Sequence, residues 1–157
     1  MTNLSFSDLS PEQQSLLQQA EKVMANAYDP YSKFMVGAAV RTGNGKTYVG
    51  ANVGNASYGL CICAEPSALV AASAAGDRRV ECVAVIGKSQ DFETVEPVTP
   101  CGRCRQFIYE FASLSGIDTE VICSNSTKDK ILVAKISELL PQAFGPGDLK
   151  IDVTRYL

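Results

Sequence analysis

The chain has 157 residues, a length typical of a single domain with one buried core, so we treat residues 1–157 as one domain. Hydrophobic residues make up 46% and charged residues 20%, as in ordinary globular proteins. The net charge of −3, without a run of Lys or Arg, argues against a nucleic-acid surface, which needs a basic stripe. No apolar stretch has the form of a signal peptide or a membrane span, so we expect a cytoplasmic protein with reduced thiols and no membrane partner.

Six cysteines and the absence of histidine restrict the chemistry available to this chain. In a reduced protein, cysteines indicate metal sites or buried thiols before they indicate disulfides. Without histidine, a transition metal must bind through thiolate or carboxylate. An acid–base group must then be Glu, Asp, Lys, Tyr or Cys.

The first part of the chain predicts a helix followed by a β-hairpin. Ser10 and Pro11 form a helix start, and the residue before Pro30 ends a helix predicted over residues 11–27. Two strands, over residues 34–42 and 46–53, flank the turn sequence Gly-Asn-Gly and are followed by an irregular loop through residue 61.

The rest of the chain alternates helices and strands. We expect helices over 64–75 and 102–112, strands over 80–86, 120–123 and 130–134, a short helical turn over 136–140 and an irregular tail over 142–157. This order predicts an α/β fold, a three-layer α-β-α sandwich around a mixed five-stranded sheet. The right-handed crossover rule places the helices that follow Cys63 and Cys101 on the same face of that sheet.

Two short segments at predicted helix starts carry residues suited to metal chemistry. Cys101-x-x-Cys104 is a short chelating loop, and Cys63 would supply a third thiolate ligand to zinc. A helix N-terminus favours thiolate over thiol because of its partial positive charge. Glu65 lies two residues after Cys63, where it can approach an open fourth position and act as general acid and base. The pattern therefore predicts a catalytic Zn²⁺ site.

A structural zinc site is the alternative interpretation of the same cysteines. Cys61 would then be the fourth ligand, and the protein would be a non-catalytic, zinc-stabilised interaction module. Otherwise Cys61, Cys82 and Cys123 are interpreted as buried apolar thiols.

Further motifs extend from about Tyr28 to Leu149. In chain order they are Tyr28-x-Pro30-Tyr31-Ser32-x-Phe34-x-Val36-Gly37-Ala38-Ala39, Asn52-Val53-x-Asn55-Ala56-Ser57-Tyr58-Gly59, Cys63-Ala64-Glu65, Pro100-Cys101-Gly102-x-Cys104-Arg105-Gln106 and Leu139-Leu140-Pro141-x-x-Phe144-Gly145-Pro146-x-Asp148-Leu149. Zinc nucleobase deaminases share a ligand-x-Glu unit followed by Pro-Cys-x-x-Cys. The whole set resembles the small, zinc-dependent, homotetrameric cytidine deaminases.

That resemblance implies hydrolytic deamination of cytidine and deoxycytidine to the uracil nucleosides, with release of ammonia. It implies Zn²⁺ held by three cysteines and a proton shuttle at Glu65. Family tetramers share their active sites, so residues of a neighbouring subunit would complete each pocket. The residues that would bind substrate are Phe34 beside the nucleoside, Asn52 on the ribose, Ala64, and Ala56, Tyr58 and Phe144 in the neighbouring subunit's pocket.

Two positions depart from the family pattern. Gly54 stands where family members usually carry a Glu that bonds the ribose 3′ hydroxyl, a charged hydrogen bond worth about 1.5–3 kcal/mol. Pro66 stands where they usually carry an Arg. Zn²⁺ with three thiolates has a net negative charge that nearby donors normally offset, so we expect Arg103, and next Arg105, to take over this task.

Both departures also resemble blasticidin-S deaminases, which act on the cytosine ring of an aminoacyl-nucleoside antibiotic. The Cys-Gly-Arg-Cys-Arg-Gln run also resembles those enzymes. The alternative substrate is therefore blasticidin S or another modified cytosine nucleoside.

Overall fold

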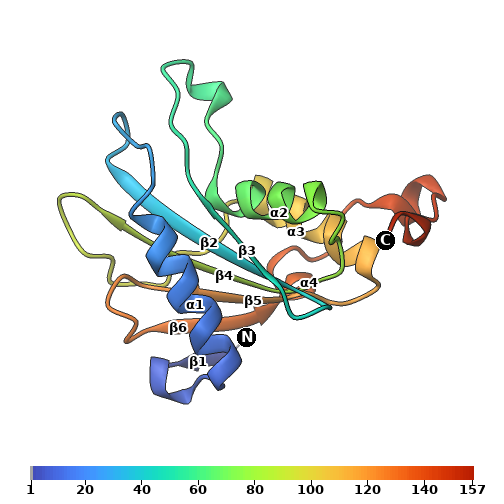
Figure 1. Ribbon diagram of the computed structural model, residues 1–157, viewed down its shortest axis with the longest axis horizontal. Coiled ribbons are helices and arrows are strands. Elements are labelled where there is room, and N and C mark those ends of the chain that lie inside the picture. The colour runs from blue at the N-terminus through green and yellow to red at the C-terminus, as the bar shows by residue number, and fades with distance from the viewer. Residues whose placement is uncertain (1) are drawn as a thin grey trace.

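The computed structural model describes residues 2–157 and has the expected α/β architecture, with helices on both faces of a mixed sheet (Figure 1). The sheet has six strands in the order β1-β6-β5-β4-β2-β3, and β4 and β5 form the one parallel pair among them. The strands are β1 Thr2–Leu4, β2 Phe34–Thr42, β3 Thr47–Ala51, β4 Val80–Ser89, β5 Glu120–Ser124 and β6 Ile131–Lys135.

The expected count of five strands was wrong, because β1 adds a sixth at the edge of the sheet. Three residues are too few to show the alternating pattern of a strand in the sequence. The strand forms because Thr2 and Leu4 pair with Val133 and Ile131 of β6, a contact across most of the chain.

Four α-helices cover the sheet, namely α1 Pro11–Met24, α2 Ala64–Ala74, α3 Gly102–Ser115 and α4 Ile136–Leu139. Helix α1 ends three residues before the expected boundary, since the chain turns there and the Tyr28 amide donates to the Asn52 carbonyl. Helix α3 continues to Ser115, where Gly116 closes it in the left-handed conformation with φ 64°. Residues 2–157 also contain four 3₁₀ turns, η1 Phe6–Asp8, η2 Tyr58–Leu60, η3 Pro146–Leu149 and η4 Thr154–Tyr156.

Alternate residues of β4 face two separate cores. Val83 and Val85 join the cluster under α2 and α3, whereas Cys82, Ala84 and Ile86 join the cluster under α1. Helices α2 and α3 therefore share one face of the sheet, as the crossover rule predicts.

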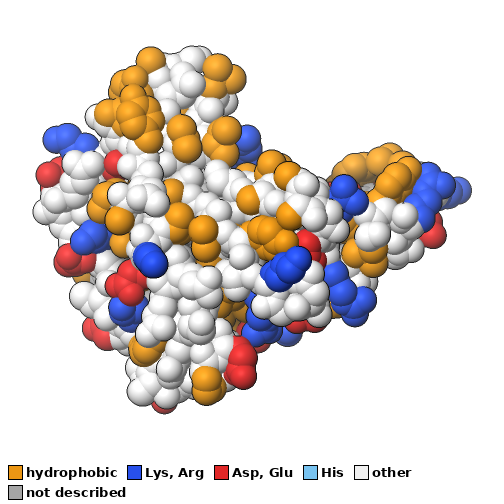
Figure 2. Space-filling view, viewed as in Figure 1, with side chains coloured by type: hydrophobic (Ala, Val, Ile, Leu, Met, Phe, Trp, Pro, Cys, Tyr) orange, Lys and Arg blue, Asp and Glu red, His pale blue; other side chains and the backbone are white. Residues whose placement is uncertain are grey.

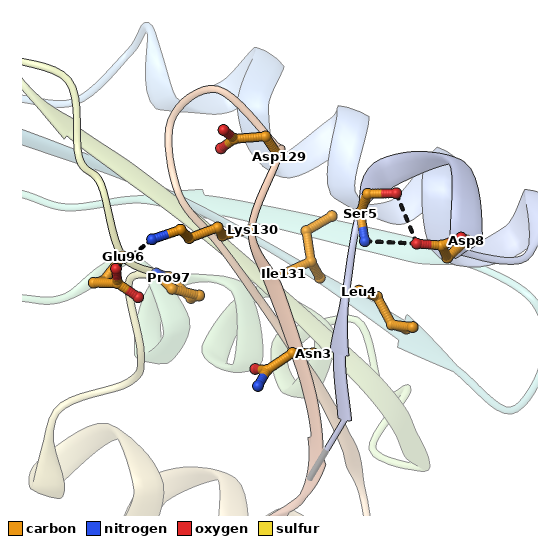
Figure 3. Close-up of a pocket in the computed structure, with 9 residues that line it drawn as sticks. All are labelled: Asn3, Leu4, Ser5, Asp8, Glu96, Pro97, Asp129, Lys130 and Ile131. Carbon is orange, nitrogen blue, oxygen red and sulfur yellow. Dashed lines mark hydrogen bonds and ion pairs between the residues drawn. The ribbon is translucent and has the colours of Figure 1, made fainter.

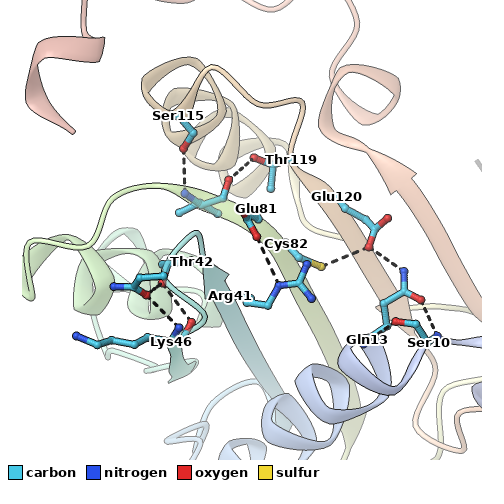
Figure 4. Close-up of polar contacts among 12 residues, drawn as sticks. Ser10, Gln13, Arg41, Thr42, Lys46, Glu81, Cys82, Ser115, Thr119 and Glu120 are labelled. Atoms are coloured by element: carbon cyan, nitrogen blue, oxygen red, sulfur yellow. Dashed lines mark hydrogen bonds and ion pairs between the residues drawn. The ribbon is translucent and has the colours of Figure 1, made fainter.

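Polar contacts connect α1 to the edge of its core (Figure 4). The Gln13 amide donates to the Glu120 carboxylate at 2.8 Å, and the Cys82 thiol lies 3.6 Å from the same oxygen. Burial raises the pKa of the Cys82 thiol, and burial also raises the pKa of Cys123 to about 12. Both thiols are fully buried, which confirms the prediction of apolar core cysteines for these two residues.

Helix α2 lies directly on β3 because Gly50 has no side chain. A Cβ atom at this position would lie 2.5 Å from the Ala68 nitrogen and 2.6 Å from the Ala64 carbonyl oxygen. Backbone atoms cannot yield as a flexible side chain can. Gly50 thus sets how closely the N-terminus of α2 approaches the sheet.

We predict that Gly50→Ala lowers the free energy of unfolding by about 1–3 kcal/mol, because the added methyl must push α2 away from β3. Gly59→Ala is the matched control, since a Cβ there meets no atom within 4 Å. Thermal unfolding of the two variants measures the difference. Equal melting temperatures would contradict this account of the α2–β3 contact.

Candidate active site

Three cysteines meet where the N-termini of α2 and α3 converge. Cys63 is the residue immediately before α2, Cys101 immediately precedes α3, and Cys104 lies in the first turn of α3. Their Sγ atoms all lie within 4.8 Å of one another, and those of Cys101 and Cys104 are 3.4 Å apart. Cys63 and Cys101 both have extended backbone conformations and make no side-chain cap to their helices, so their sulfur atoms are available to the cluster.

This cluster fits a zinc ion. Tetrahedral coordination with Zn–S bonds of about 2.3 Å places sulfur atoms about 3.8 Å apart. Cys61 lies outside the group of metal-ligating side chains found in residues 2–157, and its thiol donates instead to the Asn55 carbonyl at 3.7 Å. The geometry is thus that of three ligands with a fourth position free, rather than a closed four-cysteine site. Cys61 is half-buried and lines the adjoining cavity, so its interpretation as a buried core thiol was wrong.

Hydrogen bonds link the thiols of the cluster and shift their pKa values. The pKa of Cys63 is lowered to about 6, mainly by hydrogen bonding with Cys104, and the positive charge of Arg103 acts in the same direction. The same contact with Cys63 is the main cause of a raised pKa at Cys104. A cation bound by the three sulfurs would replace these protons.

Glu65 is the buried carboxyl group of the site. It lies in the first turn of α2, is 3% exposed, and its Oε2 atom accepts a hydrogen bond from Cys104 Sγ at 3.3 Å. Burial is the main reason that its pKa is raised. A buried carboxyl group with a raised pKa is suited to taking up and releasing a proton.

A largely apolar cavity of about 340 Å³ opens in front of the sulfur atoms and Glu65. Phe34, Asn52 and Ala64 line it, as expected of substrate-binding residues. Ala56, Tyr58 and Phe144 do not line it, and all three are exposed. Ser32 and Val36, which belong to the first motif but had no assigned role, also line the cavity. The lining residues outside the motifs are Ile62, Val98 and Thr99, which neighbour motif residues in the chain but carry no chemical signature of their own.

Asn52 holds one wall of this cavity in place. Its side-chain oxygen accepts from the Val36 amide at 2.8 Å, and its side-chain nitrogen donates to the Phe34 carbonyl at 2.9 Å. An Asn side chain has two donor hydrogens and two acceptor lone pairs, so one of each remains for a ligand.

Within residues 2–157, the hydrogen bonds donated by the two arginines near the cysteines all go to oxygen atoms. Arg103 donates to the Cys61 carbonyl at 3.2 Å. Arg105 donates to the Pro100 and Leu139 carbonyls at 2.8 Å and 2.9 Å, and to the Thr99 hydroxyl at 3.4 Å. Arg105 therefore fixes the segment before Cys101 against the end of α4.

A second hollow, of about 440 Å³, lies at the edge of the sheet between β1, β6 and the loop through Glu96 (Figure 3). None of its lining residues is a cysteine, and its three carboxylates already have partners, with Asp129 accepting from Asn125 and Thr127. Asp8 accepts from Ser5 at 2.7 Å and Glu96 accepts from Lys130. The cavity at the cysteines is the better candidate because it combines a buried carboxyl group with a metal-binding cluster.

Comparison with known proteins agrees with this geometry. Residues 10–119 match the family described as the cytidine and deoxycytidylate deaminase zinc-binding region. The chain belongs to this deaminase family. Zn²⁺ is the cofactor of the deaminase, since both the zinc-binding region and the three-cysteine cluster fit it. No helix in residues 2–157 is long and apolar enough to cross a membrane.

Known cytidine deaminases align with this chain over most of its length. A cytidine deaminase of Halalkalibacterium halodurans is 43% identical over 138 residues, which span 88% of this chain and 98% of that protein. A probable cytidine deaminase of Dictyostelium discoideum is 36% identical over 138 residues, which span 88% of this chain and 87% of that protein. The crystal structure of cytidine deaminase from Burkholderia pseudomallei is similar with a TM-score of 0.75 and 42% identity, covering 87% of this chain and all of that one.

We predict that Cys63→Ala, Cys101→Ala and Cys104→Ala each lower the zinc content well below about one ion per chain, because each removes one of three ligands. Cys61→Ser is the control and should retain the zinc. Elemental analysis after gel filtration in the presence of a weak chelator measures the content. Loss of zinc from Cys61→Ser, or full retention by Cys104→Ala, would contradict the three-cysteine assignment.

Proposed function

We propose that this deaminase removes the amino group of the cytosine ring of a free nucleoside by hydrolysis. Cytidine and deoxycytidine are converted to uridine and deoxyuridine with release of ammonia. One observation carries the proposal. The buried Glu65 carboxyl group and three converging thiols share one end of an otherwise apolar cavity. Zn²⁺ held by Cys63, Cys101 and Cys104 would supply a Lewis acid with one open position beside that carboxylate.

Glu65 acts as the proton shuttle in this proposal. It takes a proton from the attacking water and delivers it to ring N3 while the water oxygen bonds to C4. It then takes the remaining proton of that oxygen and passes it to the departing amine, so that the C4–N bond breaks and ammonia leaves. The burial that raises the pKa of Glu65 suits it to carry a proton between these steps.

Nearby side chains would position the nucleoside. Phe34 contributes an aromatic wall, Ala64 lines the cavity beside Glu65, and the remaining donor hydrogen and acceptor lone pair of Asn52 can bond the sugar. Among the described residues that line the cavity none is Lys or Arg, so a phosphate group would lack a charged partner. This favours nucleosides over deoxycytidylate as substrates.

Gly54 supports a second candidate substrate. It lines the cavity without a side chain to bond a sugar hydroxyl, so a modified cytosine nucleoside such as blasticidin S is the alternative to plain cytidine. A non-catalytic zinc module is disfavoured, because it would leave the buried Glu65 carboxyl group without a role.

We also propose that four chains assemble into a homotetramer with shared active sites in the cytoplasm, where thiols stay reduced. Tyr58 and Phe144 are 74% and 62% exposed and lie away from their own chain's cavity. Figure 2 shows apolar side chains gathered on the projecting loop that carries η2, as on surfaces that other subunits cover. Sedimentation velocity tests the proposed tetramer by measuring the mass of the particle in solution.

Glu65→Gln should lower kcat by about 10²–10⁴-fold and leave the zinc content unchanged, because the amide cannot accept and return the proton. Glu81→Gln serves as control, since Glu81 pairs with Arg41 near the surface. Ammonia release and zinc analysis provide the two measurements. Normal turnover by Glu65→Gln would exclude the shuttle.

For Arg103 we propose that its positive charge offsets the thiolates, since it lowers the pKa of Cys63 and bonds the carbonyl of Cys61. Arg103→Ala should lower kcat/KM about tenfold with nearly intact zinc, the size of effect typical of residues that support metal ligands. Arg155→Ala, in the exposed tail, is the matched control. Unchanged kinetics in Arg103→Ala would contradict this role for Arg103. We assign no such role to Arg105, because its guanidinium donates to the Pro100 and Leu139 carbonyls.

A substrate panel tests the proposed function itself. We expect loss of cytosine absorbance with cytidine and deoxycytidine, and no turnover of deoxycytidylate, because the cavity offers phosphate no cationic partner. Blasticidin S in the same panel tests the alternative substrate. Faster turnover of deoxycytidylate than of deoxycytidine would overturn the assignment to nucleosides.

A further inference from the structure

The turn that leads into β2 carries two residues of the proposed nucleoside cavity. Ser32 and Phe34 both line the cavity, and Lys33 lies between them. Lys33 has a φ of 53°, in the left-handed region that a residue with a Cβ atom adopts only when its surroundings impose it. The contacts that impose this conformation therefore also fix the cavity residues on either side of Lys33.

The backbone of Lys33 is bonded on both sides. Its amide donates to the Asp29 carbonyl at 2.9 Å, which closes the turn. Its carbonyl accepts from the Gln90 amide at 2.8 Å and from the Ser89 hydroxyl at 3.4 Å. Ser89 is the last residue of β4 and Gln90 follows it, so the turn is attached to the end of β4.

The Asp29 side chain adds a bond at the same place. Asp29 is only 5% exposed, and both of its carboxylate oxygens accept from the Gln90 side-chain amide at 3.3 Å. It takes part in none of the ion pairs found within residues 2–157. A buried carboxylate without a cation is a poor source of stability, because removing its charge from water costs free energy. Its contribution is geometric, since it connects the start of the turn to the residue that holds the end of the turn.

Gly87 shows how closely Phe34 lies against β4. Val36 pairs with Gly87, and Phe34 pairs with Ser89 in the last pair of the β2–β4 ladder. A Cβ atom at position 87 would lie 3.0 Å from the Phe34 ring and 3.3 Å from the Val36 side chain. The ring thus packs on the β4 backbone at the end of a ladder, where local opening is easiest. The contacts of the preceding turn therefore help to keep the ring in the cavity wall.

From these observations we propose that Asp29 is a positioning residue, which acts through Gln90 to hold Phe34 in the wall of the nucleoside cavity. Neither Asp29 nor Gln90 lines the cavity. The inference rests on the proposed function for the place of Phe34 beside the nucleoside. Asp29 thereby contributes to substrate affinity from outside the cavity, and leaves the chemistry at Glu65 unchanged.

Kinetics with cytidine test this role by separating KM from kcat. Asp29→Ala and Gln90→Ala should each raise KM about 3- to 10-fold, part of the effect of a hydrogen bond to a charged group. Their kcat should stay within about twofold of the wild-type value, because Phe34 contacts the ground state and the transition state alike. Asp29→Asn should behave as wild type, since its amide oxygen can still accept from Gln90. The double variant Asp29→Ala/Gln90→Ala should raise KM no more than Asp29→Ala, because both changes remove one contact.

Hydrogen–deuterium exchange gives a readout that does not need turnover. Peptides covering residues 29–36 should exchange faster in Asp29→Ala and Gln90→Ala than in the wild type, but not in Asp29→Asn. Gln90 is exposed, so Gln90→Ala tests the same contact even if Asp29→Ala does not fold. Gln18→Ala is the matched control, because Gln18 is exposed on α1 and should change neither exchange nor KM. Zinc analysis of each variant checks that the cysteine cluster is intact.

The positioning role is overturned if both Asp29→Ala and Gln90→Ala exchange at the wild-type rate. It is also overturned if they exchange faster while KM for cytidine is unchanged, or if Asp29→Asn raises KM as much as Asp29→Ala. Absence of cytidine turnover by the wild type would overturn the proposed function, whereas faster exchange in the two variants would still support the Asp29–Gln90 contact. The two failures are therefore distinguishable.

Discussion

The convergence of two helix N-termini at three sulfur atoms is the contact on which the candidate site depends. Helix α2 leads into the central strand β4 and α3 follows it, and both pack on the same face of the sheet. Cys63, Cys101 and Cys104 meet because of this arrangement, although 37 residues separate Cys63 from Cys101. Helix N-termini are electropositive, so the fold itself favours thiolates at this point.

The surroundings of the cluster are held by bonds from side chains to backbone. Asn52 fixes the β2 backbone around Phe34 and Val36, and Arg105 fixes the segment before Cys101 to the end of α4. The Asn52 bonds extend the β2–β3 pairing beyond Ala51, and the Arg105 bonds join the start of α3 to the end of α4. Groups that must act on one small molecule are thereby kept at fixed separations, which is what catalysis by positioned groups requires.

The opposite side of the cavity is formed by smaller and more exposed residues. Gly54 contributes no side chain there, and Tyr58 lies on a projecting loop outside its own chain's cavity. The cysteine cluster and Glu65 are positioned by helix packing, whereas Gly54 lies in a loop, where substitutions disturb the core least.

The sequence by itself determined the α/β class, the helices at Cys63 and Cys101, and the residue types able to bind zinc, because these follow from local periodicity and ligand spacing. It did not determine β1, whose three residues form a strand only by pairing with β6. Nor did it determine that Cys61 stays outside the cluster or that Gly54 lines the cavity beside it. Those features depend on which distant segments meet, and only the tertiary packing of the chain decides which segments are brought together.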